Sequence, residues 1–139
     1  MILPNYDVAM TAHSAPVEYL TAREIIALDS VSGPCVSLHV PVDRIGRGRM
    51  EARIRLKNMV AETESQMTAS GYRSSTAKQI LRPAREMESN EAFWQKPNDG
   101  LALFLAPEYS QSYMLNKKPT PFAKVSDGFF VRPLLSILM

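Results

Sequence analysis

Helical periodicity over a long central stretch constrains this chain most. From Met50 to Ser70, apolar and small residues recur every three or four positions, which predicts a long helix with one face in a core. Gly71 is suited to end that helix, and a second one is predicted from about Ser74. The two helices predict an antiparallel hairpin, with a kink or break at Pro83. The predicted core positions are Ala52, Leu56, Met59, Val60, Thr63 and Met67, then Ala77, Ile80, Leu81, Ala84 and Met87.

Strand patterns lie on both sides of this hairpin in the sequence. Cys35–Pro41 alternates between two faces, and the apolar run Leu101–Ala106 is typical of a central strand that is covered on both faces. Three more strands are expected at Ser110–Asn116, Phe122–Ser126 and Phe129–Arg132, the last two joined as a hairpin by Asp127-Gly128. We therefore predict an α+β fold, with a mixed or antiparallel sheet of about four to five strands and the helical hairpin packed on one face.

The domain organisation follows from length and pattern. A chain of 139 residues is typical of one domain, and it buries enough surface to form a core without disulfides. Residues 1–18 show no period and are predicted to be an irregular arm, whereas residues 19–139 form the domain, starting with a short helix capped by Thr21. The apolar end Leu134–Met139 fits either a boundary with a following domain or a tail docked on this domain's own core.

Residues that could support covalent or metal chemistry are few. Cys35 is the only cysteine, and His13 and His39 are the only histidines. Cys35 and His39 would stand about 13 Å apart along one strand, too far for a catalytic pair. No phosphate-cradling or dinucleotide motif is present, so we expect no catalytic site, no cofactor and no metal. The lone cysteine, and the lack of a secretory signal or membrane-spanning run, predict a cytoplasmic protein without membrane contact.

Positive charge is concentrated between Val42 and Asn58. This stretch has six cationic and two acidic residues, a net charge of +4, whereas the whole chain carries only +2. Its glycines allow close approach of the backbone, and arginine matches the geometry of phosphate oxygens. The stretch therefore predicts contact with RNA, and the alternative is a solvated helix face with local ion pairs such as Lys57 with Glu64. The predicted RNA-binding residues are Arg44, Arg47, Arg49, Arg53, Arg55 and Lys57.

Several segments, taken in order, carry a resemblance to a known family. They are Pro34–Pro41, Ile54–Val60, Leu81–Arg85, Ala92–Trp94, Asp99–Pro107 and Val131–Leu135. Together they resemble the N-terminal domain of the bacterial branch of the archaeo-eukaryotic-type peptide chain release factors, a Pelota-related ribosome-rescue group. The resemblance covers most of the chain, and the order of the segments is more specific than any one of them.

The resemblance implies the first domain of a longer protein that contacts the ribosome, through ribosomal RNA or tRNA. The Gly-Gly-Gln motif, which carries peptidyl-tRNA hydrolysis in that family, does not occur here, so we expect no hydrolase activity from this chain. The Asn-Ile-Lys-Ser motif of the eukaryotic factors is also missing, so contact with the RNA backbone is expected and codon reading is not. The alternative is a protein-interaction or self-association domain, which eight methionines and the apolar end would suit. The sequence indicates no oligomeric state.

Overall fold

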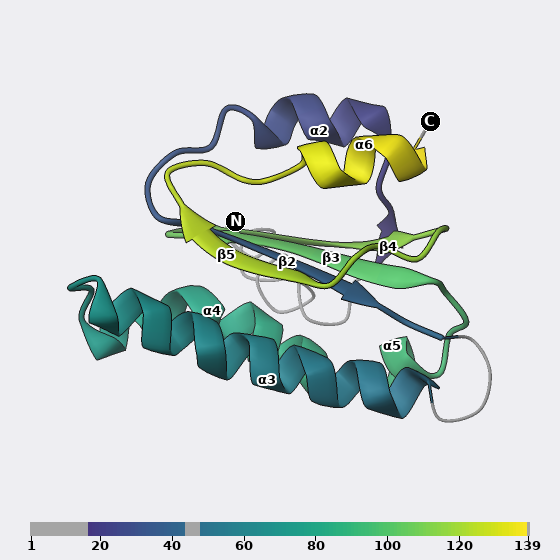
Figure 1. The fold of residues 1–139 in the computed structure, drawn as a ribbon, viewed down its shortest axis with the longest axis horizontal. Helices are drawn as coiled ribbons and strands as arrows, with labels where there is room; N and C mark the ends of the chain where they lie inside the picture. The colour runs from purple at the N-terminus through teal and green to yellow at the C-terminus, as the bar shows by residue number, and fades with distance from the viewer. Residues whose placement is uncertain (1–16, 44–47, 139) are drawn as a thin grey trace, which may run out of the picture.

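The computed structural model describes residues 17–43 and 48–138. These residues form three layers, in which a five-stranded sheet lies between a long helical hairpin on one face and two short helices on the other (Figure 1). We call the face of the sheet that the hairpin covers the lower face, and the face that the two short helices cover the upper face, as they lie in Figure 1. The α+β fold with a mixed sheet and a packed hairpin is confirmed.

The sheet has the strand order β1-β4-β3-β2-β5. Its strands are Glu18–Tyr19 (β1), Cys35–Pro41 (β2), Gly100–Ala106 (β3), Tyr109–Leu115 (β4) and Phe122–Ser126 (β5). β1 runs parallel to β4, and every other pairing is antiparallel. The central strand β3 is buried along its whole length, because helices cover both of its faces. This double cover explains the uninterrupted apolar run that predicted it.

The helices follow the predicted periodicity closely. They are Ala22–Leu28 (α2), Gly48–Ala69 (α3), Ser74–Glu88 (α4), Glu91–Trp94 (α5) and Arg132–Leu138 (α6). Gly71 has a φ of 101°, in the left-handed region, which lets the chain turn from α3 into α4. α4 continues through Pro83 without the predicted break. Burial of Leu81 and Ala84 against the core holds the helix on both sides of the proline.

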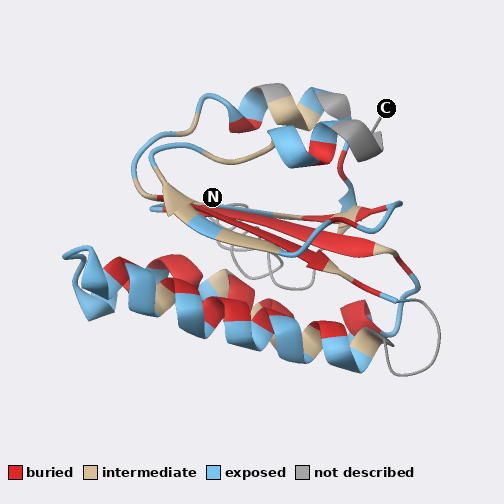
Figure 2. Cartoon of the chain, in the orientation of Figure 1, coloured by how far each residue is buried: buried red, intermediate tan, exposed pale blue. Residues whose placement is uncertain are grey.

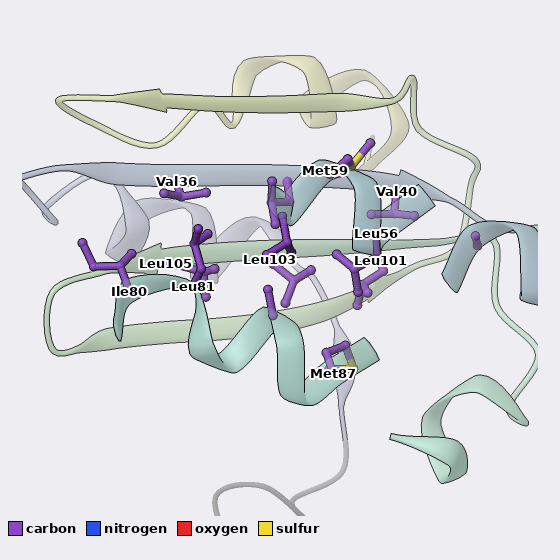
Figure 3. Close-up of a cluster of buried hydrophobic side chains, with 14 of the residues drawn as sticks. Val36, Val40, Leu56, Met59, Ile80, Leu81, Met87, Leu101, Leu103 and Leu105 are labelled. Atoms are coloured by element: carbon purple, nitrogen blue, oxygen red, sulfur yellow. The ribbon is translucent and has the colours of Figure 1, made fainter. Parts of the chain in front are cut away.

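An apolar cluster fills each face of the sheet. On the lower face, Leu56 of α3 and Leu81 of α4 pack toward Leu103 and its neighbours on β2 and β3 (Figure 3). All the core positions predicted for the two long helices are buried, and exposed residues lie on their outer sides (Figure 2). The upper cluster is smaller and consists of Leu20, Leu28, Ala102, Phe104, Tyr113, Leu115 and Leu134.

The C-terminal region differs from its prediction. Residues 129–131 form no strand, and Arg132–Leu138 is a helix with Pro133 in its first turn, where a missing backbone donor costs nothing. The segment after β5 crosses to the upper face instead of pairing at the sheet edge, because the apolar surface there needs cover. Leu134 is fully buried in the upper cluster, so this part of the apolar end docks on the domain's own core.

The predicted arm falls almost entirely outside the described residues, which begin at Val17. The last residue of the predicted arm is Glu18. It belongs to strand β1, where it pairs with Tyr113 of β4. The domain therefore starts slightly earlier than predicted. Among the described helices, none combines the length and the apolar character needed to cross a membrane.

Candidate nucleic-acid interface

Three segments that are far apart in the sequence meet at one end of the sheet. Strand pairing places Pro41 beside Gly100 and Gly100 beside Leu115, so β2 ends, β3 begins and β4 ends at the same place (Figure 1). The backbone N–H of Val42 donates to the carbonyl of Asp99 at 3.1 Å, which joins the first two segments. We call the described residues of 42–58, 91–99 and 116–118 the basic end.

Two turns of the basic end pack tightly on each other. The side-chain oxygen of buried Asn98 accepts from the backbone N–H of Gly100 at 3.0 Å, and its amide nitrogen donates to the carbonyl of Lys96 at 3.1 Å. A Cβ on Gly100 would lie 2.5 Å from Cδ of Pro119. Only glycine therefore allows this close approach, which fixes Lys96 relative to the turn that carries Lys118.

The basic end carries more positive than negative charge. Its described residues include seven cationic and four acidic side chains, whereas the whole chain has a net charge of only +2. The cationic residues are Arg49, Arg53, Arg55, Lys57, Lys96, Lys117 and Lys118, and the acidic ones are Asp43, Glu51, Glu91 and Asp99. Two ion pairs lie within it among the described residues, Lys118 with Asp43 and Arg53 with Glu91. Two of the predicted RNA-binding residues, Arg44 and Arg47, lie outside the described residues.

Arg49 and Arg53 are engaged inside the domain. Nη1 of Arg49 donates to the carbonyls of Gln95 at 2.7 Å and Trp94 at 3.3 Å. Nε of Arg53 donates to the carbonyl of Glu88 at 2.6 Å, and its Nη1 lies 2.9 Å from Oε2 of Glu91. The last carbonyls of a helix lack intrahelical donors and carry its negative dipole end, so cations are favoured there. Both arginines therefore hold α3 against the ends of α4 and α5.

Arg55 and Lys57 are exposed on different sides of α3. Two positions along an α-helix correspond to a rotation that leaves side chains about 160° apart, so Arg55 faces away from Arg53 and from α4. Lys57 lies one turn after Arg53 and remains on the α4 side. The structure thus divides the four described members of the predicted set: two brace the fold, and two reach solvent on separate surfaces.

The expected pairing of Lys57 with Glu64 does not form, because Glu64 binds two other partners. Its carboxylate lies 2.6 Å from Nζ of Lys78 and 2.5 Å from Nη2 of Arg85, both on α4. These hydrogen-bonded cations lower the pKa of the Glu64 carboxyl group. Lys57 is left exposed, with no ion pair among the described residues.

Sequence reasoning missed the lysines at positions 96, 117 and 118. They lie far from the basic stretch along the chain, and only the strand order brings them beside it. The available signal was the short turn between Leu101–Ala106 and the strand after it, because two strands joined by so short a turn pair as antiparallel neighbours. That pairing places the turn before the first strand next to the turn after the second.

The nucleophile candidates are unsuited to catalysis. The Sγ of buried Cys35 lies 3.8 Å from the carbonyl oxygen of Val31 and 3.6 Å from that of Asp127, and burial raises the pKa of the thiol. Burial lowers the pKa of His39 to about 4. Neither side chain contacts solvent, and the described part of the chain holds no group of three or more potential metal ligands.

Comparison with known proteins leaves the family open. No protein-family model matches the sequence, and no curated protein matches it either. The resemblance to release factors therefore stays a prediction from the ordered sequence segments. The feature on which a functional proposal can be built is the basic end.

Proposed function

We propose that this domain is a non-catalytic module that contacts RNA through its basic end. The observation that carries the proposal is that three separate segments, which carry Lys57, Lys96 and Lys117, meet at one end of the sheet. All three are exposed, and none forms an ion pair with a described residue. Exposed cations without partners keep their full charge available to an incoming polyanion.

Phosphate is the chemical group that such a surface suits best. A lysine ammonium group binds phosphate as a point charge, and each neutralised phosphate releases condensed counterions. α3 also begins at this end, and the N-terminus of a long helix favours negative charge. These features support contact with the RNA backbone and give no reason to expect reading of base sequence.

We place this RNA in the translation machinery on the strength of the resemblance alone. A first domain of a release-factor-like protein would bind and orient on the ribosome, while other domains performed chemistry. The buried state of Cys35 and His39 agrees with a domain that contributes binding. In this proposal the partner is ribosomal RNA or tRNA, and a longer parent protein supplies the catalytic site.

Charge removal tests this proposal. Lys57, Lys96, Lys117 and Lys118 would be changed together to Gln, and binding to purified bacterial ribosomes and to transfer RNA would be measured over a salt series. We expect the slope of log K against log[salt] to become shallower by roughly 2 to 4, because each lost phosphate contact reduces it by about 0.7 to 0.9.

A matched control removes four cations elsewhere. Arg23, Arg73, Lys124 and Arg132 are exposed and lie outside the basic end, so their change to Gln removes the same net charge. This control variant should keep most of the salt slope. Equal losses in the two variants would show a general charge effect, and no binding by the unaltered chain would end the proposal.

A second candidate is a protein-interaction surface on α3. Met50 is 65% exposed and Ile54 is 53% exposed, and they lie one helical turn apart. A truncation that removes residues 133–139 would be a poor test of self-association, because it also removes buried Leu134. Size-exclusion chromatography of the unaltered chain and of a Met50→Ser, Ile54→Ser double variant is a better test, because both positions are exposed. A dimer that these changes dissociate would favour this candidate.

A further inference from the structure

His39 is the most unusual buried group among the described residues. Its side chain is fully buried, and neither ring nitrogen makes a hydrogen bond to a described residue. The backbone of Phe130 lies close enough to favour the protonated form in part, but not in hydrogen-bond geometry. Buried polar groups are normally paired, so an unpaired imidazole calls for an explanation.

Aromatic rings surround this imidazole on the upper face of the sheet. Phe122 of β5 stacks on it with ring centres 5.0 Å apart, and Phe104 of β3 meets it edge-on at 6.1 Å. Phe130 packs on Phe122 at 5.4 Å, and Phe129 packs on Phe104 at 5.4 Å. The ring is therefore enclosed by side chains that offer it no acceptor.

Two of the enclosing rings belong to a segment with few attachments. Residues 127–138, which we call the C-terminal strap, comprise the crossing after β5 and helix α6. The strap is tied to β2 by the backbone N–H of Phe130, which donates to Oγ of Ser37 at 2.9 Å, and by a long contact from Sγ of Cys35 to the carbonyl of Asp127. Its other anchors include the two phenylalanine rings, of which that of Phe129 also packs on Tyr109 of β4, together with partly buried Val131 and buried Leu134.

We propose that the C-terminal strap is an acid-sensitive cover that opens when His39 is protonated. A charged imidazolium in this enclosure would have no water, no counter-charge and only the poorly aligned backbone of Phe130 near it, and burying an unpaired charge is costly. Opening the strap admits water to the ring while the rest of the sheet stays paired. The lower cluster, which holds α3 and α4 to the sheet, involves no residue of the strap.

The charged groups around the enclosure give no compensation. Lys124 lies two residues along β5 from Phe122 and places its Nζ 5.2 Å from the Phe130 ring, so a second positive charge would oppose protonation. On β2 the nearest titratable group is the Cys35 thiol, and β3 contributes only Ala102 and Phe104. On β4, Tyr113 is a neutral phenol at the pH values concerned.

The carboxylates of the upper layer lie outside the enclosure. Asp127 belongs to the strap itself and is exposed, and Glu24 is bonded to its own helix cap at Thr21. Arg132 on α6 and Arg23 on α2 are exposed cations. None of these groups contacts the imidazole, so protonation of His39 gains no ion pair while the strap is closed.

The pH window follows from the two states of the ring. An exposed imidazole has a pKa near 6.5, and burial lowers that of His39 to about 4. The open form therefore binds more protons between these values, and the closed form loses stability as the pH falls from 6.5 toward 4. Above pH 6.5 the equilibrium constant for opening of the strap does not change with pH. Below pH 4 it levels off at up to about 300 times its value above pH 6.5.

Amide hydrogen exchange of the full chain, followed by NMR and corrected for intrinsic rates, tests this proposal. From pH 7 to pH 5, exchange at the hydrogen-bonded amides of Phe130 and Leu134 should accelerate by about tenfold or more, while amides in the middle of α3 keep their protection. The His39→Phe variant keeps an aromatic ring in the enclosure without a titrating group. Its strap should show no such pH dependence.

A second measurement holds even if the His39→Phe variant fails to fold. In a His13→Ala variant the only imidazole is that of His39, so its titration can be followed directly by NMR. A pKa well below 6 supports the proposal, and a pKa near 6.5 with the strap still protected overturns it. Loss of α3 protection together with that of the strap would also overturn it, because the transition would then be global unfolding.

Discussion

At the scale of single residues, Gly100 decides whether the basic end can form. The turn before β3 and the turn after β4 touch at this position, where a Cβ would meet the ring of Pro119. Pro119 is buried and its ring is rigid, so it cannot move aside cheaply. The tolerance for one extra methyl group is therefore low at the point that joins two of the three basic segments.

Gly100→Ala should destabilise the domain by about 1 to 3 kcal/mol, the usual cost of overpacking a tight site. Chemical denaturation followed by circular dichroism measures this change. Gly128→Ala is the matched control, because a Cβ there meets nothing within 4 Å, and its effect should stay within about 0.5 kcal/mol. Equal stability of the two variants would contradict the close contact.

Cys35 should react slowly as long as the domain is folded. Burial raises the pKa of its thiol, so less of the reactive thiolate is present at any given pH, and no solvent reaches it. Labelling with iodoacetamide at pH 8 should be at least about 100 times slower in the native chain than in the chain unfolded by urea. Similar rates in both states would show that this end of β2 is open.

At the scale of elements, the arginines of α3 show why a charge count alone predicts a surface poorly. Arg49 and Arg53 belong to the stretch that predicted RNA contact, yet their guanidinium groups are bonded to the ends of α4 and α5. A one-dimensional pattern gives the charge of a helix but not the helix ends that pack beside it. These two residues are better described as braces between elements.

This role predicts unequal effects of two similar substitutions. Arg53→Ala should cost about 1 to 2 kcal/mol in the free energy of unfolding, because the carbonyl of Glu88 loses its donor. Arg55→Ala, two positions away and exposed, should change it by less than about 0.5 kcal/mol. Thermal unfolding of both variants decides the matter, and a reversed order would refute the assignment.

The elements themselves were largely predictable because their periodicity is strong. The helical hairpin, β2 and β3 follow from residues such as Leu56, Leu81 and Leu103, whose spacing matches their burial. The prediction is wrong at residues 129–132, because Asp127-Gly128 predicts a hairpin whose second strand does not form. That dipeptide signals a turn but not its partner, and here Phe129 and Phe130 cover the upper face instead.

At the scale of the whole molecule, strand order creates the candidate site. β5 lies beside β2 although it follows β4 in the chain, and the turn between β4 and β5 carries Lys117 and Lys118 to the start of α3. Local sequence patterns contain no information about such an order. For this reason the first basic segment could be predicted from sequence, whereas the position of the other two segments beside it could not.

The most direct test of the central claim is an NMR titration of the ¹⁵N-labelled chain with transfer RNA at low and moderate salt. The RNA-contacting surface proposed here predicts that the amides of Lys57, Lys96 and Lys117 shift or broaden together, and that added salt reverses the change. Amides of α6 and of the turn at Gly71 should stay unchanged. Perturbations confined to those distant regions, or none at any RNA concentration, would contradict the claim.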